Sequence, residues 1–225
     1  MGRKIGDIYS EYKIPPNLQK HMFRVAAVAS MICDNFNEPL EKDDIIASCL
    51  FHDMGNIIKY DMEYFPQYLE PEGLEYWQKV KGDYIEKYGK NEHEATLKII
   101  KELGLSEKIL EFVDQINFSL TCNHRDSNDF NTKIINYADW RIDPHGVVSY
   151  EERLIEAEER YKNKEDLFPL EEREKFIACG KDIEKQIFAK CKIKPEDIGN
   201  KTIEPLILEL KNFVIHSMKT QDHGE

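Results

Sequence analysis

The sequence of 225 residues predicts an all-α fold. Apolar residues recur at spacings of three and four along most of the chain, and hardly any segment alternates with the period of two that is typical of strands. Ser, Asn, Gly and Pro residues also stand where such helices would begin and end. The length allows one compact domain or two small ones, and no internal repeat is visible.

The first helices have clear local signals. Apolar residues recur at helical spacing over 17–35, directly after the pair Pro15–Pro16, which holds the preceding backbone extended. A second helix is predicted over 42–53, with Gly55 as its C-terminal stop. The next stretch, 56–90, is rich in aromatic residues and interrupted by Gly and Pro, so we expect an excursion of broken helices. Its aromatic rings could stack on a base, but a satellite core is the commoner use.

Capping signals locate the helices of the second half. Asn91 and Glu94 form a capping box that opens a helix, Gly104 closes it, and Ser106 caps the next one. Further helices are predicted over 131–140, 149–161, 169–191 and 202–218. We place a division near residue 167, with a helical core over 1–166 and C-terminal helices over 167–225 that pack on it, as part of one domain or as an appendage.

Charge and composition exclude several classes of protein. The chain has 31 Lys and Arg against 43 Asp and Glu, a net charge of -12, which disfavours nucleic acid as a partner. No apolar run approaches the ~20 residues of a membrane helix, and the first residues lack the apolar stretch of a signal peptide. The five cysteines are odd in number and widely spaced, without a CxxC pair, which argues against a disulfide framework. We therefore expect a cytoplasmic protein with no membrane partner.

Histidine gives the sharpest functional signal. His21, His52, His93 and His124 each lie near a predicted helix or helix end, and Asp53 directly follows His52. Imidazole and carboxylate groups are ligands of divalent metals, and a carboxylate can bridge two ions. The residue types alone permit a site for one metal ion or for two.

In their order and context these residues resemble the H…HD…D pattern of the HD-domain metal-dependent phosphohydrolases. His21 in LQKHMFRVAAVA resembles the first ligand, the His52–Asp53 doublet in ASCLFHDMGN the central motif, and Asp139 in IINYADWR the closing aspartate. The resemblance covers roughly residues 17–161. It implies an HD-domain-like helical bundle, with the aromatic excursion after the doublet and additional C-terminal helices.

Two further histidines sharpen the resemblance. His93 in NEHEA and His124 in TCNHRD resemble the extra ligands of two-metal members, such as cyclic dinucleotide phosphodiesterases and diadenosine tetraphosphate hydrolases. This implies two ions that share Asp53, the predicted catalytic residue. The first is held by His21, His52, Asp53 and Asp139, and the second by Asp53, His93 and His124. The implied ions are divalent transition metals (Fe, Mn, Zn, Ni or Co), with Mg also compatible.

The activity that the resemblance implies is hydrolysis of a nucleotide or another small phosphorylated compound by a metal-activated water, with the type of phosphate linkage left open. One departure matters, because Asn56 stands where many members have a lysine. Three cations are candidates for the phosphate contact instead: Lys59, Arg125 and Arg141. Arg24, three residues after His21 on the same helix, could contact a phosphate, but an ion pair within the chain is its expected use. The departure at Asn56 also keeps open a non-catalytic, ligand-sensing protein built on the same helices.

Overall fold

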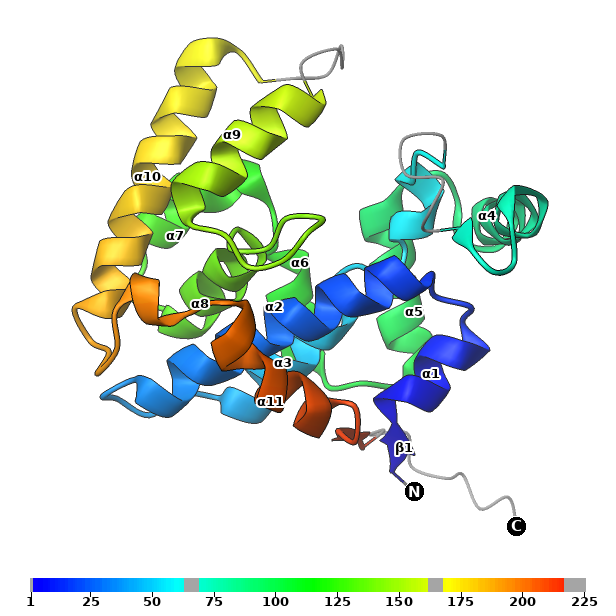
Figure 1. Cartoon of the computed structure of the whole chain (residues 1–225), viewed down its shortest axis with the longest axis horizontal. Helices are drawn as coiled ribbons and strands as arrows, with labels where there is room; N and C mark the ends of the chain where they lie inside the picture. The colour runs from blue at the N-terminus through cyan, green and yellow to red at the C-terminus, as the bar shows by residue number, and fades with distance from the viewer. Residues whose placement is uncertain (1, 63–68, 162–167, 217–225) are drawn as a thin grey trace.

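The structure is a computed structural model, and it describes residues 2–62, 69–161 and 168–216. Helices make up nearly all of its regular structure, which confirms the all-α prediction. Figure 1 shows α9 (Tyr150–Tyr161) and α10 (Leu170–Phe188) side by side at one end of the molecule and α4 (Leu74–Tyr88) at the other. Within the described ranges, no helix combines the length and the apolar character needed to cross a bilayer.

The centre of the fold is α2 (Pro16–Asn35), which is buried on nearly all sides. It packs against α3 (Lys42–Phe51), α8 (Phe130–Asp139) and α11 (Asn200–Leu210). A run of small or β-branched residues over 25–30 lets these helices approach closely, and this part of α2 has no residue that faces solvent. A helix enclosed in this way holds its side chains in fixed positions.

The predicted caps of α5 (Glu92–Leu103) and α6 (Glu107–Asp114) are present. The Asn91 side chain accepts a hydrogen bond from the Glu94 amide, and the Ser106 hydroxyl accepts one from the Ile109 amide. Gly104 ends α5 in the left-handed conformation, with φ of 66°. The short helix α7 (Thr121–Asp126) was not predicted, because six residues leave too little periodicity to detect.

The prediction for the end of the second helix is wrong. α3 ends at Phe51, so His52 and Asp53 lie in the turn that follows it, and Gly55 is not a left-handed cap, since its φ is -91°. A Cβ on Gly55 would lie 2.2 Å from the carbonyl oxygen of Glu92. Gly55 therefore allows the N-terminus of α5 to lie directly against the turn that holds the doublet, and its amide donates to Thr96 Oγ1 at 2.9 Å.

The aromatic excursion is more regular than predicted. After the short 3-10 helix η1 (Asn56–Lys59), α4 runs without a break through Gly82. Trp77, Tyr84 and Tyr88 are buried in the main hydrophobic core of the molecule and not in a separate satellite core. Three of the aromatic residues, Tyr64, Phe65 and Tyr68, lie outside the described residues.

The C-terminal helix is shorter than predicted, and positions 217 and 218 of the prediction lie outside the described residues. α11 ends at Leu210, and β2 (Val214–Ile215) then pairs antiparallel with β1 (Arg3–Lys4), which precedes α1 (Ile5–Glu11). Because these strands are two residues long and lie at opposite ends of the chain, neither leaves a pattern in the sequence. The division near residue 167 stays a prediction.

A disulfide corrects the interpretation of the cysteines. Cys122 on α7 is bonded to Cys179 on α10, with 5.1 Å between their Cα atoms, whereas Cys33, Cys49 and Cys191 are free. The pair is 57 residues apart in the sequence, and only the packing of α10 on α7 brings it together. The disulfide fixes one end of the α9–α10 pair to the helix that carries His124.

Candidate metal centre

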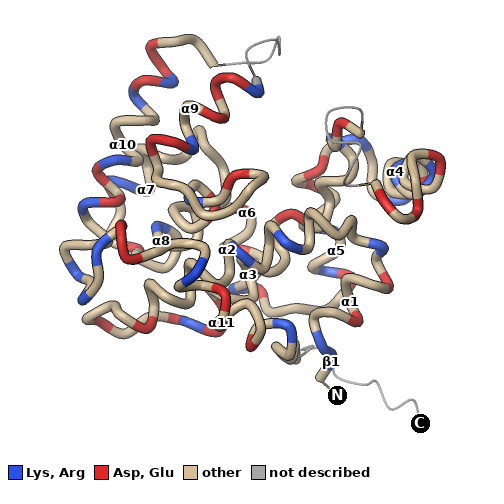
Figure 2. Tube along the Cα trace, in the orientation of Figure 1, with Lys and Arg blue, Asp and Glu red and all other residues tan. Residues whose placement is uncertain are grey.

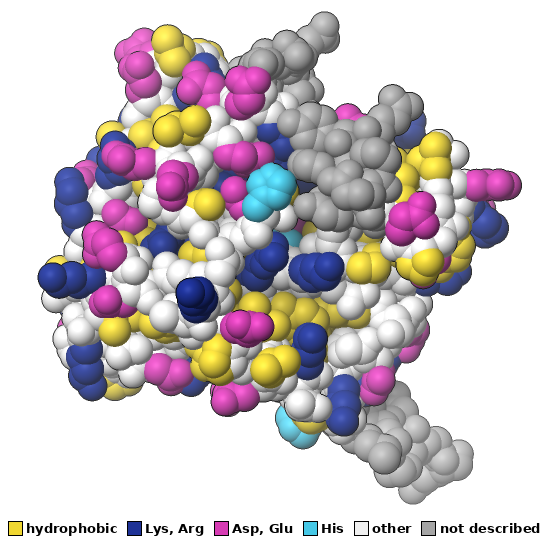
Figure 3. Space-filling model, in the orientation of Figure 1, with side chains coloured by type: hydrophobic (Ala, Val, Ile, Leu, Met, Phe, Trp, Pro, Cys, Tyr) yellow, Lys and Arg dark blue, Asp and Glu magenta, His cyan; other side chains and the backbone are white. Residues whose placement is uncertain are grey.

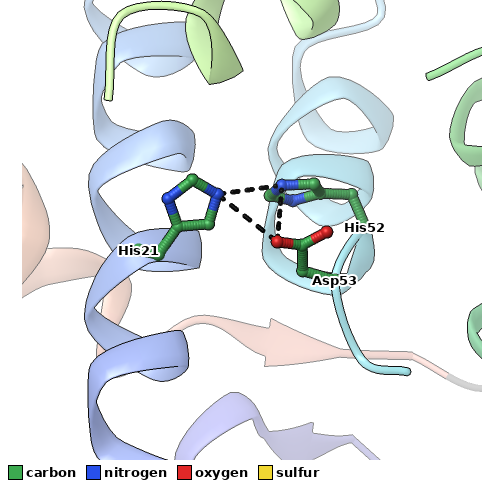
Figure 4. Close-up of side chains that lie close together, drawn as sticks. All are labelled: His21, His52 and Asp53. Atoms are coloured by element: carbon green, nitrogen blue, oxygen red, sulfur yellow. Dashed lines mark hydrogen bonds and ion pairs between the residues drawn. The ribbon is translucent and has the colours of Figure 1, made fainter. Parts of the chain in front are cut away.

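Four of the predicted ligands come together where α2, α8 and the turn after α3 meet. His21 Nε2 lies 3.2 Å from His52 Nε2, 3.5 Å from Asp53 Oδ2 and 3.0 Å from Asp139 Oδ1. Figure 4 shows the His21 side chain pointing from α2 across to the His52 ring and the Asp53 carboxylate. The ligand atoms of His21, His52 and Asp53 lie within 4.8 Å of one another, which is close enough to hold one ion.

The His52 ring is fixed in one orientation by the backbone. Its Nδ1 lies 2.8 Å from the carbonyl oxygen of Cys49, and because a carbonyl can only accept, Nδ1 carries a proton. Nε2 is therefore the atom directed at the cluster. The same arrangement is usual in histidines that bind a metal through one ring nitrogen and donate a hydrogen bond from the other N–H. Burial of the ring disfavours its charged form, but Asp53 and Asp139 favour it, and the pKa of His52 is raised to about 9.

Asp139 completes the cluster from the C-terminal end of α8. Its Oδ1 lies 3.0 Å from His21 Nε2 and 3.5 Å from His52 Nε2. Burial acts to raise the pKa of this carboxyl, but hydrogen bonds from His21 and His52 hold it well below its ordinary value. The carboxylate is therefore ionised at neutral pH and able to balance cationic charge in the cluster.

The two additional histidines lie outside this cluster, but both have the arrangement that a ligand needs. His93 Nε2 lies 3.3 Å from Asp114 Oδ1, and His124 Nε2 lies 2.9 Å from the carbonyl oxygen of Gln115. Each ring thus uses Nε2 for a protein acceptor and keeps Nδ1 for another partner. His124 is buried, which lowers its pKa and favours the neutral form that binds metals.

Packing places His93 near the doublet and links His124 to α8. His93 follows Glu92, whose backbone lies against Gly55, two residues beyond Asp53. On the other side, the buried Asn136 donates to the carbonyl oxygen of Gln115 at 3.4 Å and lies one turn before Asp139 on α8. No sequence pattern points to Gln115 or Cys49, because both act through backbone oxygens. Asn136, a polar residue on the buried face of α8, was the one visible signal.

The three candidate phosphate contacts have different surroundings. Lys59 forms an ion pair with Glu92 at 3.2 Å. Burial acts to raise the pKa of Glu92, but Lys59 and a backbone hydrogen bond together lower it below its ordinary value. The charge of Asp53 acts to raise this pKa, so Glu92 lies within electrostatic range of the doublet. Arg125 forms a surface ion pair with Asp126 at 2.8 Å.

Arg141 has a structural role, and its contact with substrate stays a prediction. It is 3% exposed, and its guanidinium donates to four acceptors of the protein. These are Tyr137 Oη at 2.8 Å and the carbonyl oxygens of Val148, Pro195 and Ile198. The network ties the loop before α9 and the segment before α11 to α8, and it uses four of the five N–H donors of the guanidinium.

The donor set suits a divalent metal ion. Two imidazole nitrogens and two carboxylates are a common ligand combination for transition metals, and the orientation of His52 is already set by Cys49. Acidic and basic residues alternate along the described chain in Figure 2. In Figure 3, however, Lys and Arg side chains lie near a histidine in the middle of the face shown, so the net charge does not describe every part of the surface.

Comparison with known proteins identifies the family. The family model "HD domain" matches residues 18–142, which is more than half of the chain and contains every predicted metal ligand. No curated protein and no solved structure matches the chain. HD domains bind divalent metals and are generally metal-dependent phosphohydrolases. The match, the all-α fold and the cluster of His21, His52, Asp53 and Asp139 agree, and the chain belongs to the HD domain family.

Proposed function

We propose that this protein is a metal-dependent phosphohydrolase that acts on a nucleotide or another small phosphorylated compound. The observation that carries the proposal is the convergence of His21, His52, Asp53 and Asp139 from three separate elements, with Nε2 of His52 directed at the cluster by the bond to Cys49. A structural ion pair would need only one histidine and one carboxylate. Two histidines and two carboxylates at these distances favour a cation as their common partner.

The proposal includes two ions. The first is held by His21, His52, Asp53 and Asp139, and the second by Asp53, His93 and His124. The second set rests on the free Nδ1 atoms of the two additional histidines and on the contact between Gly55 and Glu92 that brings α5 to the doublet. When bound, divalent ions lower the pKa of water and stabilise negative charge on phosphoryl oxygens. Asp53 is the one carboxylate common to both sets.

The roles of the protein groups follow from their positions. The Cys49 carbonyl and the neighbouring carboxylates hold His52 in place, so that the site is preorganised. Lys59 pairs with Glu92, on which the charge of Asp53 also acts, and its exposed ammonium is able to exchange Glu92 for a phosphate oxygen. Arg125 remains a second candidate for this contact, since its partner Asp126 is exposed.

A ligand-sensing protein without catalysis is the second candidate function. It is favoured by Asn56 at the position where many family members have a lysine, and by the pairing of Lys59 with Glu92, which leaves less positive charge for a phosphate. Such a protein would bind a phosphorylated ligand and release it unchanged.

The test combines metal analysis with a substrate panel. Metal content is measured on the purified chain, and phosphomonoesters, dinucleoside polyphosphates and nucleoside triphosphates are assayed with each of Mn, Fe, Co, Ni, Zn and Mg. We expect bound metal and phosphate release, and we expect Asp53→Ala to lose both while keeping a helical circular dichroism spectrum. Asp83→Ala on α4, which removes a carboxylate from an exposed ion pair with Lys79, is the matched control. Binding without product would favour the sensor, and an active Asp53→Ala protein would refute the site.

A further inference from the structure

Arg24 lies on the same face of α2 as His21. Successive residues of a helix are rotated by about 100°, so positions 17, 21 and 24 fall within about 60° of one another. Asn17, His21 and Arg24 therefore form a stripe along α2, and the candidate metal centre lies at the middle of this stripe. A ligand that extends from the centre along α2 meets either Asn17 or Arg24.

The end of the stripe at Asn17 is closed by the protein. Asn17 Nδ2 lies 2.5 Å from Tyr60 Oη, and Lys81 donates to the carbonyl oxygen of Tyr60 at 2.9 Å. The other polar atom of Asn17, Oδ1, is buried from solvent. These contacts leave the Arg24 end as the direction in which a ligand extends from the centre.

Arg24 itself is half-buried and has no hydrogen bond or ion pair with any residue that the structure describes. The ion pair expected from the sequence is therefore not formed within these ranges. This is unusual in a chain with 43 acidic residues, because a partly desolvated guanidinium is more stable with an acceptor for its five donors. An anionic ligand would supply the missing acceptor.

The distance from the centre decides which part of a ligand Arg24 would hold. Three residues correspond to about 4.5 Å along the helix axis, and the side chain adds several ångströms of reach. At this distance the guanidinium of Arg24 would contact the chemical group next to the phosphoryl group that lies at the metal centre. A guanidinium also fits the oxygens of a phosphate with two parallel hydrogen bonds.

We propose that Arg24 binds a second phosphate group next to the one at the metal centre, so that the substrate is an organic diphosphate or polyphosphate. This inference rests on the proposed function, and it narrows the substrate class. Substrates with a single phosphate lack the group that pairs with Arg24 and bind more weakly.

The test measures binding, independently of turnover. Methylenediphosphonate, which is not hydrolysed, and inorganic phosphate are titrated by calorimetry into the metal-loaded wild type and three variants, and metal content is measured before and after. The variants are Arg24→Gln, Arg24→Lys and Lys20→Gln. Lys20 is exposed on the same helix about 100° away from His21, so Lys20→Gln controls for loss of one positive charge.

We expect Arg24→Gln to weaken methylenediphosphonate binding by about tenfold to a hundredfold while phosphate binding and metal content stay at the wild-type level. Arg24→Lys should restore part of the loss, and Lys20→Gln should have no effect. In assays, Arg24→Gln should raise the KM for diphosphates and leave the KM for monophosphates unchanged. If Arg24→Gln binds methylenediphosphonate with wild-type affinity, or if the substitution weakens the binding of both probes equally, this inference is overturned while the proposed function stands. A wild type that binds neither probe and cleaves no phosphoester would overturn the proposed function with it.

Discussion

Asp114 and Gln115, consecutive residues at the end of α6, each contact a different candidate ligand. The Asp114 carboxylate lies 3.3 Å from His93 Nε2, and the Gln115 carbonyl oxygen lies 2.9 Å from His124 Nε2. One helix end thus orients two rings that come from α5 and α7. Because both contacts use Nε2, both rings keep Nδ1 for another partner.

This relationship predicts the effect of Asp114→Asn. The amide cannot balance charge on the His93 ring as the carboxylate does, so the affinity of the second ion should fall by about tenfold to a hundredfold while the first ion stays bound. Metal content at limiting metal concentration measures both ions. Asp83→Asn, an exposed carboxylate on α4, should have no effect. Equal metal content in Asp114→Asn and wild type would show that His93 does not hold an ion.

Gly55→Ala should destabilise the protein by about 1 to 3 kcal/mol. The new Cβ would lie 2.2 Å from the Glu92 carbonyl oxygen and 2.9 Å from the Thr96 amide nitrogen, so α5 must move away from the doublet. The melting temperature should fall by about 2 to 4 °C for each kcal/mol of lost stability in a chain of this size. Gly82→Ala is the matched control, because no atom lies within 4 Å of its Cβ and alanine favours the helix, so its melting temperature should rise. Equal effects in the two variants would contradict the close approach of α5.

The network of Arg141 predicts a loss of stability rather than a specific loss of substrate binding. Arg141→Met should lower the free energy of unfolding by at least about 2 kcal/mol, because it leaves four buried acceptors with fewer donors. Arg125→Met removes an exposed arginine and should change stability by no more than about 0.5 kcal/mol. Chemical denaturation compares the two. A stable Arg141→Met protein with a raised KM would instead support Arg141 as a substrate contact.

The disulfide between Cys122 and Cys179 should stabilise the oxidised chain. Closure of a loop with a sequence separation of 57 corresponds to about 4 kcal/mol in the chain-entropy description. We expect the melting temperature of the wild type to fall on addition of a reductant, and that of Cys179→Ser to stay unchanged. Cys191→Ser, which removes a free cysteine, should respond as the wild type does. Identical melting with and without reductant, with both thiols titratable in the unfolded chain, would mean that the bond does not form.

The pKa of His52 predicts how the metal-free protein responds to pH. Its value of about 9 lies above the ordinary value of about 6.5, so protonation of His52 stabilises the fold. This contribution is fully present below about pH 6.5 and is lost as the pH rises through about 9. Urea unfolding of protein treated with a chelator should show this loss, and His52→Gln should remove it. With metal present the trend should reverse, because metal needs a deprotonated Nε2. A flat profile in the metal-free wild type would refute the coupling.

Several features could be predicted from the sequence because they depend on neighbouring residues. The start and end of α2 follow from Pro15 and the helical spacing of its apolar residues, and the caps at Asn91 and Ser106 act over three residues. The candidate metal centre was also recognisable, since His21, the His52–Asp53 doublet and Asp139 stand in a characteristic order.

Other features depend on segments that are distant in the sequence and adjacent in space, and only the tertiary structure decided them. The pairing of β1 with β2 and the bond between Cys122 and Cys179 belong to this class, and so does the burial of Arg141 by residues near 148 and 198. Gly55 looks like a helix stop in the sequence, yet its role is the close approach of α5. A residue type fixes which bonds a side chain can form, whereas the helices packed around it determine which partners are within reach.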